Sequence, residues 1–130
     1  MPDVTIRYDR QKVHRAVLDE MRSRLPNIVA EHLCIPETDG ALTPDDIELN
    51  FHAYGPDDLH GKYILEIIID ANLYRKRSAN LDQRTQRIKL DIALILELVE
   101  TKLMSWFVQG YSIKDDQWFV WVRLSKASFR

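Results

Sequence analysis

The first part of the chain alternates apolar and polar positions and then changes to a helical period. Val4, Ile6 and Tyr8 alternate with polar residues, which is the period of two typical of a strand. Apolar positions spaced by four then predict a helix with Asp9 as its N-terminal cap, and these positions are Val13, Val17, Met21 and Leu25. Pro26 is expected to kink or restart this helix, because proline removes one backbone hydrogen bond.

Two strands are predicted in the middle of the chain. Residues 47–53 alternate between apolar and polar positions, and residues 63–70 form an apolar run interrupted by Glu66. We interpret them as neighbouring strands joined by the loop at residues 54–61. The apolar run predicts that both faces of its strand are covered, with another subunit as the cover of one face.

A long helix and a final strand complete the pattern. A polar, basic connection at residues 71–79 leads into this helix, with Asn80 and Gln83 as a capping-box pair. Its apolar stripe consists of Leu81, Ile88, Ile92, Ile95, Val99, Leu103 and Trp106. We assign residues 105–111 to the last helical turn rather than to the arm of a hairpin, with Gly110 as the stop. Residues 118–122 read as a strand.

The order of elements predicts an α+β fold built from a duplicated β-α-β unit. A strand, a helix and a strand occur twice, which gives a four-stranded mixed sheet with two helices on one face. The 130 residues fit a single domain that spans residues 1–130. A ferredoxin-like binding module has the same order of elements, so it stays open as an alternative.

Composition excludes several classes of protein. The net charge of -2 argues against a nucleic-acid partner, and no apolar run is long enough for a membrane span or a signal peptide. The single cysteine, Cys34, forms no internal disulfide, so we expect a cytoplasmic protein. No cofactor and no metal site is predicted, because His52 and His60, which flank a loop with Asp57 and Asp58, match no compact zinc spacing; both are expected to be solvent-exposed loop histidines.

The start of the chain offers unusual chemistry. If Met1 is removed, Pro2 presents a secondary amine, a base and nucleophile that no ordinary side chain supplies. The basic residues Arg75, Lys76 and Arg77 are read either as a solvated start of the second helix or as an anion-binding group. The tryptophans, Trp106, Trp118 and Trp121, are expected in the core or at a subunit contact.

Three local features resemble the tautomerase superfamily, which includes 4-oxalocrotonate tautomerase, macrophage migration inhibitory factor and 5-carboxymethyl-2-hydroxymuconate isomerase. Met1-Pro2 leads directly into a strand. Residues 29–36, Val-Ala-Glu-His-Leu-Cys-Ile-Pro, end a helix and are followed by Asp45-Asp46-Ile47. Arg77-Ser78 lies between the third strand and the second helix, with Lys76 where the isomerases have glycine. The resemblance covers nearly the whole chain and implies a tautomerase-like homotrimer.

The resemblance also implies an activity and its residues. Pro2 matches the proline that acts as general base and moves a proton in an enol or unsaturated carboxylic acid. Arg77 matches a substrate-binding arginine, and Arg10 is offered where the family uses an arginine near the first helix. Arg7 and Arg75 are further substrate-binding candidates without a motif match.

The assignment as an enzyme is conditional on removal of Met1, because a retained methionine makes the Pro2 nitrogen a tertiary amide. The alternative is a non-enzymatic oligomeric α+β module that binds a small acid or a protein partner.

Overall fold

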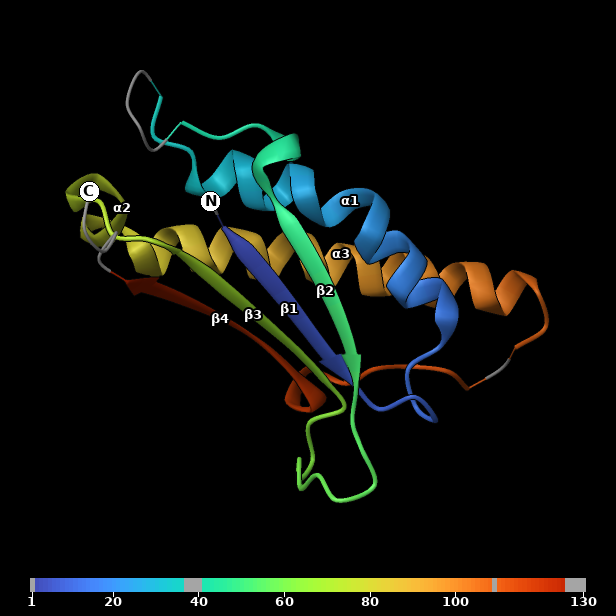
Figure 1. The fold of residues 1–130 in the computed structure, drawn as a ribbon. Coiled ribbons are helices and arrows are strands. Elements are labelled where there is room, and N and C mark those ends of the chain that lie inside the picture. The colour runs from blue at the N-terminus through green and yellow to red at the C-terminus, as the bar shows by residue number, and fades with distance from the viewer. Residues whose placement is uncertain (1, 37–40, 109, 126–130) are drawn as a thin grey trace.

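The fold is a single four-stranded sheet with its helices on one face (Figure 1). The structure is a computed structural model of the chain and describes residues 2–36, 41–108 and 110–125. Its elements are β1 (Asp3–Tyr8), α1 (Arg15–Leu33), η1 (Pro44–Asp46), β2 (Glu48–Ala53), β3 (Leu65–Asn72), α2 (Arg75–Ala79), α3 (Leu81–Ser105), η2 (Asp115–Gln117) and β4 (Trp118–Ser125). None of the helices in these residues has the length and hydropathy needed to cross a membrane.

The sheet has the strand order β2-β1-β3-β4. β1 pairs with β2 and β3 pairs with β4 in parallel, whereas β1 and β3 pair in antiparallel fashion with Asp3 opposite Asp70. The predicted α+β fold of two β-α-β units is therefore confirmed. In a ferredoxin-like sheet another strand separates the two strands of each unit. Here those two strands are direct neighbours, so the arrangement is the tautomerase-like one.

The prediction that the two middle strands are neighbours was wrong. β1 lies between β2 and β3, because each helical crossover returns the chain beside the strand that it left. The loop from residue 54 to residue 64 therefore passes the end of β1, and both ends of this loop form backbone hydrogen bonds with the chain there. Tyr54 N–H donates to Tyr8 O at 2.8 Å, and Asp9 N–H donates to Ile64 O at 2.9 Å.

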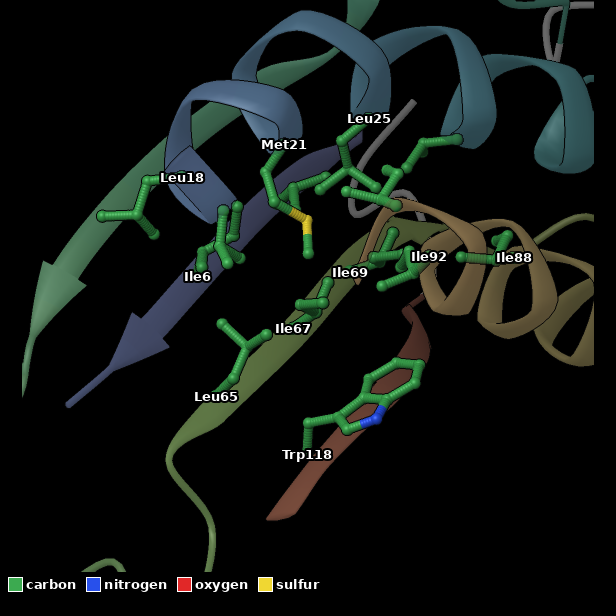
Figure 2. Close-up of a cluster of buried hydrophobic side chains, with 14 of the residues drawn as sticks. Ile6, Leu18, Met21, Leu25, Leu65, Ile67, Ile69, Ile88, Ile92 and Trp118 are labelled. Atoms are coloured by element: carbon green, nitrogen blue, oxygen red, sulfur yellow. The ribbon is translucent and has the colours of Figure 1, made fainter. Parts of the chain in front are cut away.

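The hydrophobic core lies between the sheet and the two long helices (Figure 2). Alternate strand residues point into it, among them Ile6, Leu65, Ile67 and Ile69, and all four are fully buried. Each such side chain contributes about 1.5–3 kcal/mol relative to an exposed one. The helices supply the other wall with Val17, Met21, Leu25, Val29, Ile88, Ile92, Val99 and Leu103. The expected helical stripes are thus the buried faces, except at the two ends of α3, where Leu81 is half-buried and Trp106, beyond the last turn, is 60% exposed.

The start of α1 differs from the prediction that Asp9 caps it. The helix begins at Arg15, and the ring Nδ1 of His14 accepts a hydrogen bond from Ala16 N–H at 3.0 Å. Asp9 instead closes a separate turn, in which its Oδ1 accepts from Gln11 N–H at 2.9 Å.

The expectation that the helix restarts at Pro26 was also wrong, whereas a kink there stays a prediction. α1 is one helix through this position. Its buried residues Leu25 and Val29 continue the packed face on either side, so tertiary packing outweighs the lost hydrogen bond.

The ends of α3 also differ from the prediction. Asn80 makes no side-chain cap, and its amide oxygen accepts from Arg84 Nε–H at 2.6 Å. The helix stops at Ser105 rather than near Gly110. Phe107 has a φ of 66°, while Val108 N–H donates to the oxygen of Leu103 at 2.8 Å. This is a Schellman ending with phenylalanine where glycine is usual.

The sheet face away from the helices, which we call the open face, carries a different set of side chains. Alternation places Thr5, Arg7, Ile68, Phe119 and Trp121 there. Along β3, residues of the helical face are buried and those of the open face are half-buried. The apolar run at residues 63–70 thus has one face covered within the chain, and its cover by another subunit stays a prediction.

Candidate functional site

Pro2 lies directly before β1, the strand that β2 and β3 flank. It is buried, and its carbonyl oxygen accepts a hydrogen bond from Glu48 N–H at 3.1 Å. Because β1 and β3 run in opposite directions, the start of β1 lies beside the end of β3. We call this edge the Pro2 end of the sheet. Met1, whose removal the chemistry requires, lies outside the described residues.

Arg77 lies at the Pro2 end with its charge in the interior. Its side chain is 1% exposed, its Nε–H donates to Leu33 O at 2.9 Å and its Nη1–H donates to Asn72 O at 2.7 Å. Burial lowers the pKa of the Arg77 guanidinium. These contacts fasten the end of α1 to the end of β3. Substrate binding by Arg77 stays a prediction, and the contacts seen are structural.

Arg84, which sequence reasoning did not select, also binds carbonyl groups at the C-terminal end of α1. Its Nη1–H donates to His32 O at 2.7 Å and to Cys34 O at 3.2 Å. The last carbonyl groups of a helix lack partners within the helix and carry partial negative charge. Two guanidinium groups therefore satisfy them. The Asn80 to Arg84 spacing of one helical turn was visible in the sequence, but the carbonyl groups that Arg84 binds were not.

Arg75 is the exposed arginine of the Pro2 end. It begins α2, two residues before Arg77. Arg75 is exposed to solvent, whereas Arg77 in the same short helix is buried. Within the part of the chain that the structure describes, the Arg75 guanidinium makes no hydrogen bond or ion pair. Arg75 therefore presents its guanidinium to solvent at this edge.

Arg7 and Arg10 lie at the opposite edge, which we call the Arg7 end. Five residue steps of about 3.3 Å separate Pro2 from Arg7, so the two α-carbons are about 17 Å apart along the strand. An arginine side chain does not span that distance. A single chain thus places Pro2, Arg75 and Arg77 at the same end of the sheet, and it leaves Arg7 and Arg10 at the other end.

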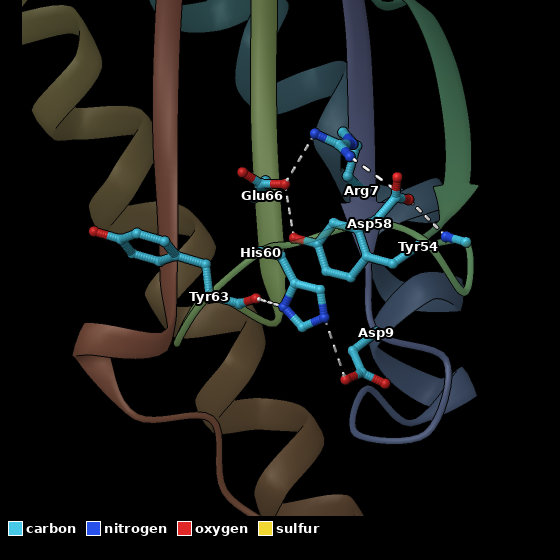
Figure 3. A network of polar contacts seen from close by, with 8 residues as sticks. Arg7, Asp9, Tyr54, Asp58, His60, Tyr63 and Glu66 are labelled. Atoms are coloured by element: carbon cyan, nitrogen blue, oxygen red, sulfur yellow. Dashed lines mark hydrogen bonds and ion pairs between the residues drawn. The ribbon is translucent and has the colours of Figure 1, made fainter.

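The Arg7 end holds a network of charged and aromatic side chains (Figure 3). Arg7 lies 3.5 Å from Glu66 and 3.9 Å from Asp58, and its guanidinium lies 5.2 Å from the centre of the Tyr54 ring. The Tyr54 hydroxyl group donates a hydrogen bond to Glu66 Oε2 at 2.7 Å. Burial and this hydrogen bond to a carboxylate raise the pKa of Tyr54, so the phenol stays protonated.

His60 belongs to the same network and is not the solvent-exposed loop residue that we expected. Its side chain is 22% exposed, and its ring stacks on Tyr54 with the centroids 4.0 Å apart. Nδ1 lies 2.6 Å from the Tyr63 carbonyl oxygen, so Nδ1 carries a proton, while Nε2 faces Asp9 at 3.9 Å. His52 is exposed, as expected.

A hollow of about 590 Å³ adjoins this network. Its lining includes Asp9, Arg10, Tyr54, Asp58 and His60. Sequence reasoning named Arg10 for another site, and it missed this one because two segments far apart in the chain, residues 9–11 and 53–60, form it. The hollow offers carboxylates and an imidazole nitrogen, which suit a ligand that carries hydrogen-bond donors.

Comparison with known proteins concerns the fold. No family model and no curated protein matches the sequence. The crystal structure of native Ps01740 is similar over 98% of this chain and 97% of that chain, with a TM-score of 0.59 and 11% identity. The crystal structure of Leishmania major MIF2 aligns over 97% of this chain and 90% of that chain, with a TM-score of 0.48 and 18% identity. The chain has a tautomerase-like fold.

Proposed function

We propose that this protein is a tautomerase-type isomerase with Pro2 as its general base. The observation that carries the proposal is the place of Pro2, a buried residue at the head of a central strand of a tautomerase-like sheet. After removal of Met1, its secondary amine takes a proton from one position of an enol or unsaturated acid and returns it to a conjugated carbon. Burial of an amine disfavours its protonated form, which supports a role as base.

The Pro2 end also suits an anionic substrate. Arg75 is exposed there, and a guanidinium binds a carboxylate with two parallel hydrogen bonds. The positive charges of Arg77 and Arg84 at the same edge disfavour a protonated amine and favour the negative charge that develops on a dienolate. We assign carboxylate binding first to Arg75 and keep Arg77 as a second candidate.

We further propose a homotrimer as the active form. Arg7 and Arg10 lie too far from Pro2 in one chain to contact the same small acid, so a neighbouring subunit would have to supply them. The open face of the sheet, with half-buried Ile68 and Phe119 and the more exposed Trp121, is the surface that such an assembly would cover.

The test is the activity of untagged protein whose removal of Met1 has been verified by intact mass. We expect turnover of phenylpyruvate-type or 2-hydroxymuconate-type enols, with loss of the proline-dependent rate in Pro2→Ala. Pro56→Ala is the matched control, because Pro56 lies in an exposed loop at the other edge. No turnover by processed protein, or equal rates in the two variants, would overturn the proposal.

One observation favours a second candidate, a non-enzymatic oligomeric module that binds a small acid or a protein partner. Arg77 is the arginine that best matches the family pattern. Its guanidinium is buried and hydrogen-bonded to main-chain carbonyl groups. This candidate predicts that acetylation of the N-terminus changes no measurable property, whereas Arg75→Ala weakens acid binding. Turnover and calorimetric acid binding, each measured before and after N-terminal acetylation, distinguish the two, because only the enzyme loses turnover when the Pro2 amine is blocked.

A further inference from the structure

The outer surface of the helical layer brings together three side chains that can ligate a metal. Glu31 and His32 lie in the last turn of α1, and Asp91 lies in the neighbouring helix α3. One ligand atom from each side chain lies within 4.8 Å of those of the other two. Residues 31 and 91 are sixty positions apart, so no spacing in the sequence indicates this group.

His32 and Asp91 form the centre of the group. His32 Nε2 lies 2.6 Å from Asp91 Oδ2, and the two side chains are 14% and 36% exposed. Two ligand atoms on one tetrahedral Zn²⁺, each about 2.0–2.2 Å from the metal, lie roughly 3.3–3.6 Å apart. A rotation of the half-exposed Asp91 side chain that moves its carboxylate oxygen by about 1 Å therefore replaces the hydrogen bond with one bond from each side chain to the metal, and exposed Glu31 can bind the same ion.

The local charge is close to balanced. Glu31 and Asp91 bring two carboxylates to the C-terminal end of α1. Arg77 and Arg84 bring two guanidinium groups, which are fixed on the carbonyl oxygens of Leu33 and His32. A cation in this group is therefore held by the ligand atoms themselves rather than by an excess of negative charge.

The surroundings leave room for the remaining ligands. Asp91 lines a hollow of about 340 Å³ between α1 and α3, with Arg24, Asn27 and Ile28 on the side of α1. Three protein ligands with an open position for water are a common arrangement for zinc. One imidazole with two carboxylates suits a divalent transition metal better than Mg²⁺ or Ca²⁺, which prefer oxygen ligands alone.

We propose that Glu31, His32 and Asp91 bind one divalent transition-metal ion of the Zn²⁺ class between the two long helices. The ion links α1 to α3 across the outside of the core. Because the three ligands meet only in the folded chain, the metal stabilises the fold.

The test is calorimetric titration of untagged, metal-free protein with Zn²⁺ and, separately, with Mg²⁺. We expect one Zn²⁺ per chain, a higher unfolding temperature with Zn²⁺, and far weaker Mg²⁺ binding. His32→Ala and Asp91→Asn should each weaken Zn²⁺ binding by at least the roughly 10- to 100-fold loss that outer-shell partners cause. The matched controls, His52→Ala and Asp82→Asn, alter an exposed histidine and an exposed aspartate and should bind as the wild type does.

Cys34 provides the alternative ligand that must be distinguished, since it lies two residues beyond His32. Cys34→Ser should retain Zn²⁺ binding, and the Co²⁺ form should show no thiolate absorption band. If His32→Ala does not fold, Asp91→Asn together with Glu31→Gln gives the same test. Binding that survives loss of His32 or Asp91, or that disappears in Cys34→Ser, would overturn the proposal.

Discussion

The Arg77 guanidinium is buried and donates hydrogen bonds to main-chain carbonyl oxygens. Its guanidinium holds the Leu33 and Asn72 carbonyl groups, and the ring of Tyr74 lies 5.0 Å from it. A motif match identified this residue as important without revealing what it contacts. The same residue type at position 75 faces solvent, so identity alone did not separate a structural arginine from one available to a ligand.

Replacement of Arg77 should therefore cost stability. Arg77→Ala removes the charge-assisted hydrogen bonds to Leu33 and Asn72 and leaves these carbonyl groups without that partner, so we expect a loss of about 2–3 kcal/mol in the free energy of unfolding. Arg77→Lys should restore only part of it, because an ammonium lacks the planar fork. Arg75→Ala, in the same short helix, should stay within about 0.5 kcal/mol. Equal losses for the two alanine variants in urea unfolding would contradict this role.

The candidate site residues divide into those that the local sequence identifies and those that only the strand order brings together. Pro2 was found because its chemistry follows from its position before a strand. His60, Tyr54 and Asp9 form one network only because β1 lies between β2 and β3, and that order was not predicted. With β2 and β3 expected as neighbours, Tyr54 and His60 were placed on a simple hairpin loop and Asp9 at a helix cap, so their contacts were missed.

The elements themselves were predictable where periodicity is strong. The strands and the buried stripes of α1 and α3 follow directly from periods of two and of about four. The boundaries were not predictable where side chains compete for the same backbone groups. His14 rather than Asp9 caps α1, and Phe107 ends α3 in a conformation that the sequence would assign to glycine.

The two long helices are also joined by charge, and this contact predicts a pH dependence. Lys102 Nζ lies 2.5 Å from Glu20 Oε1, and Arg24 Nε lies 2.7 Å from Glu20 Oε2. Hydrogen bonds from Lys102 and then Arg24 hold the pKa of Glu20 below its usual value. A lowered pKa stabilises the fold above the unfolded-state pKa, and this contribution is lost as the pH falls through the lowered value.

The measurement is urea unfolding at a series of acidic pH values. The wild type should lose stability as the pH falls below the usual glutamate pKa, and Glu20→Gln should lose less over the same interval. Lys102→Met should flatten the profile in the same direction, because it removes the larger cause of the shift. A Glu20→Gln profile as steep as that of the wild type would count against this coupling of α1 to α3.

At the scale of the whole molecule, the sheet has one covered face and one open face. The open face carries Trp121, which is 52% exposed and lies under the Arg123 guanidinium, while Arg123 pairs with Asp70 at 2.6 and 2.8 Å. Ile68, Phe119 and Trp121 form its apolar part among polar and charged side chains, and an apolar centre with a polar rim is typical of a subunit contact. From the apolar run at residues 63–70, the sequence predicts that another subunit covers this face, and that cover stays a prediction.

Assembly through this face is testable. We expect a trimer mass by sedimentation for the wild type and a shift to monomer for Trp121→Asp. Leu59→Asp is the control, since Leu59 is fully exposed in a loop at the Arg7 end and should leave the mass unchanged. A monomeric wild type, or a trimer that Trp121→Asp leaves intact, would contradict assembly through the open face.

The state of the Pro2 nitrogen is the most direct test of the proposed function. Protein labelled with ¹⁵N-proline can be titrated by NMR after its mass has been checked for loss of Met1. The proposal predicts an amine resonance for Pro2 that titrates below the ordinary range of N-terminal amines, with loss of activity as the amine protonates. A resonance that stays at the position of an amide at every pH, or an amine fully protonated at neutral pH, would contradict it.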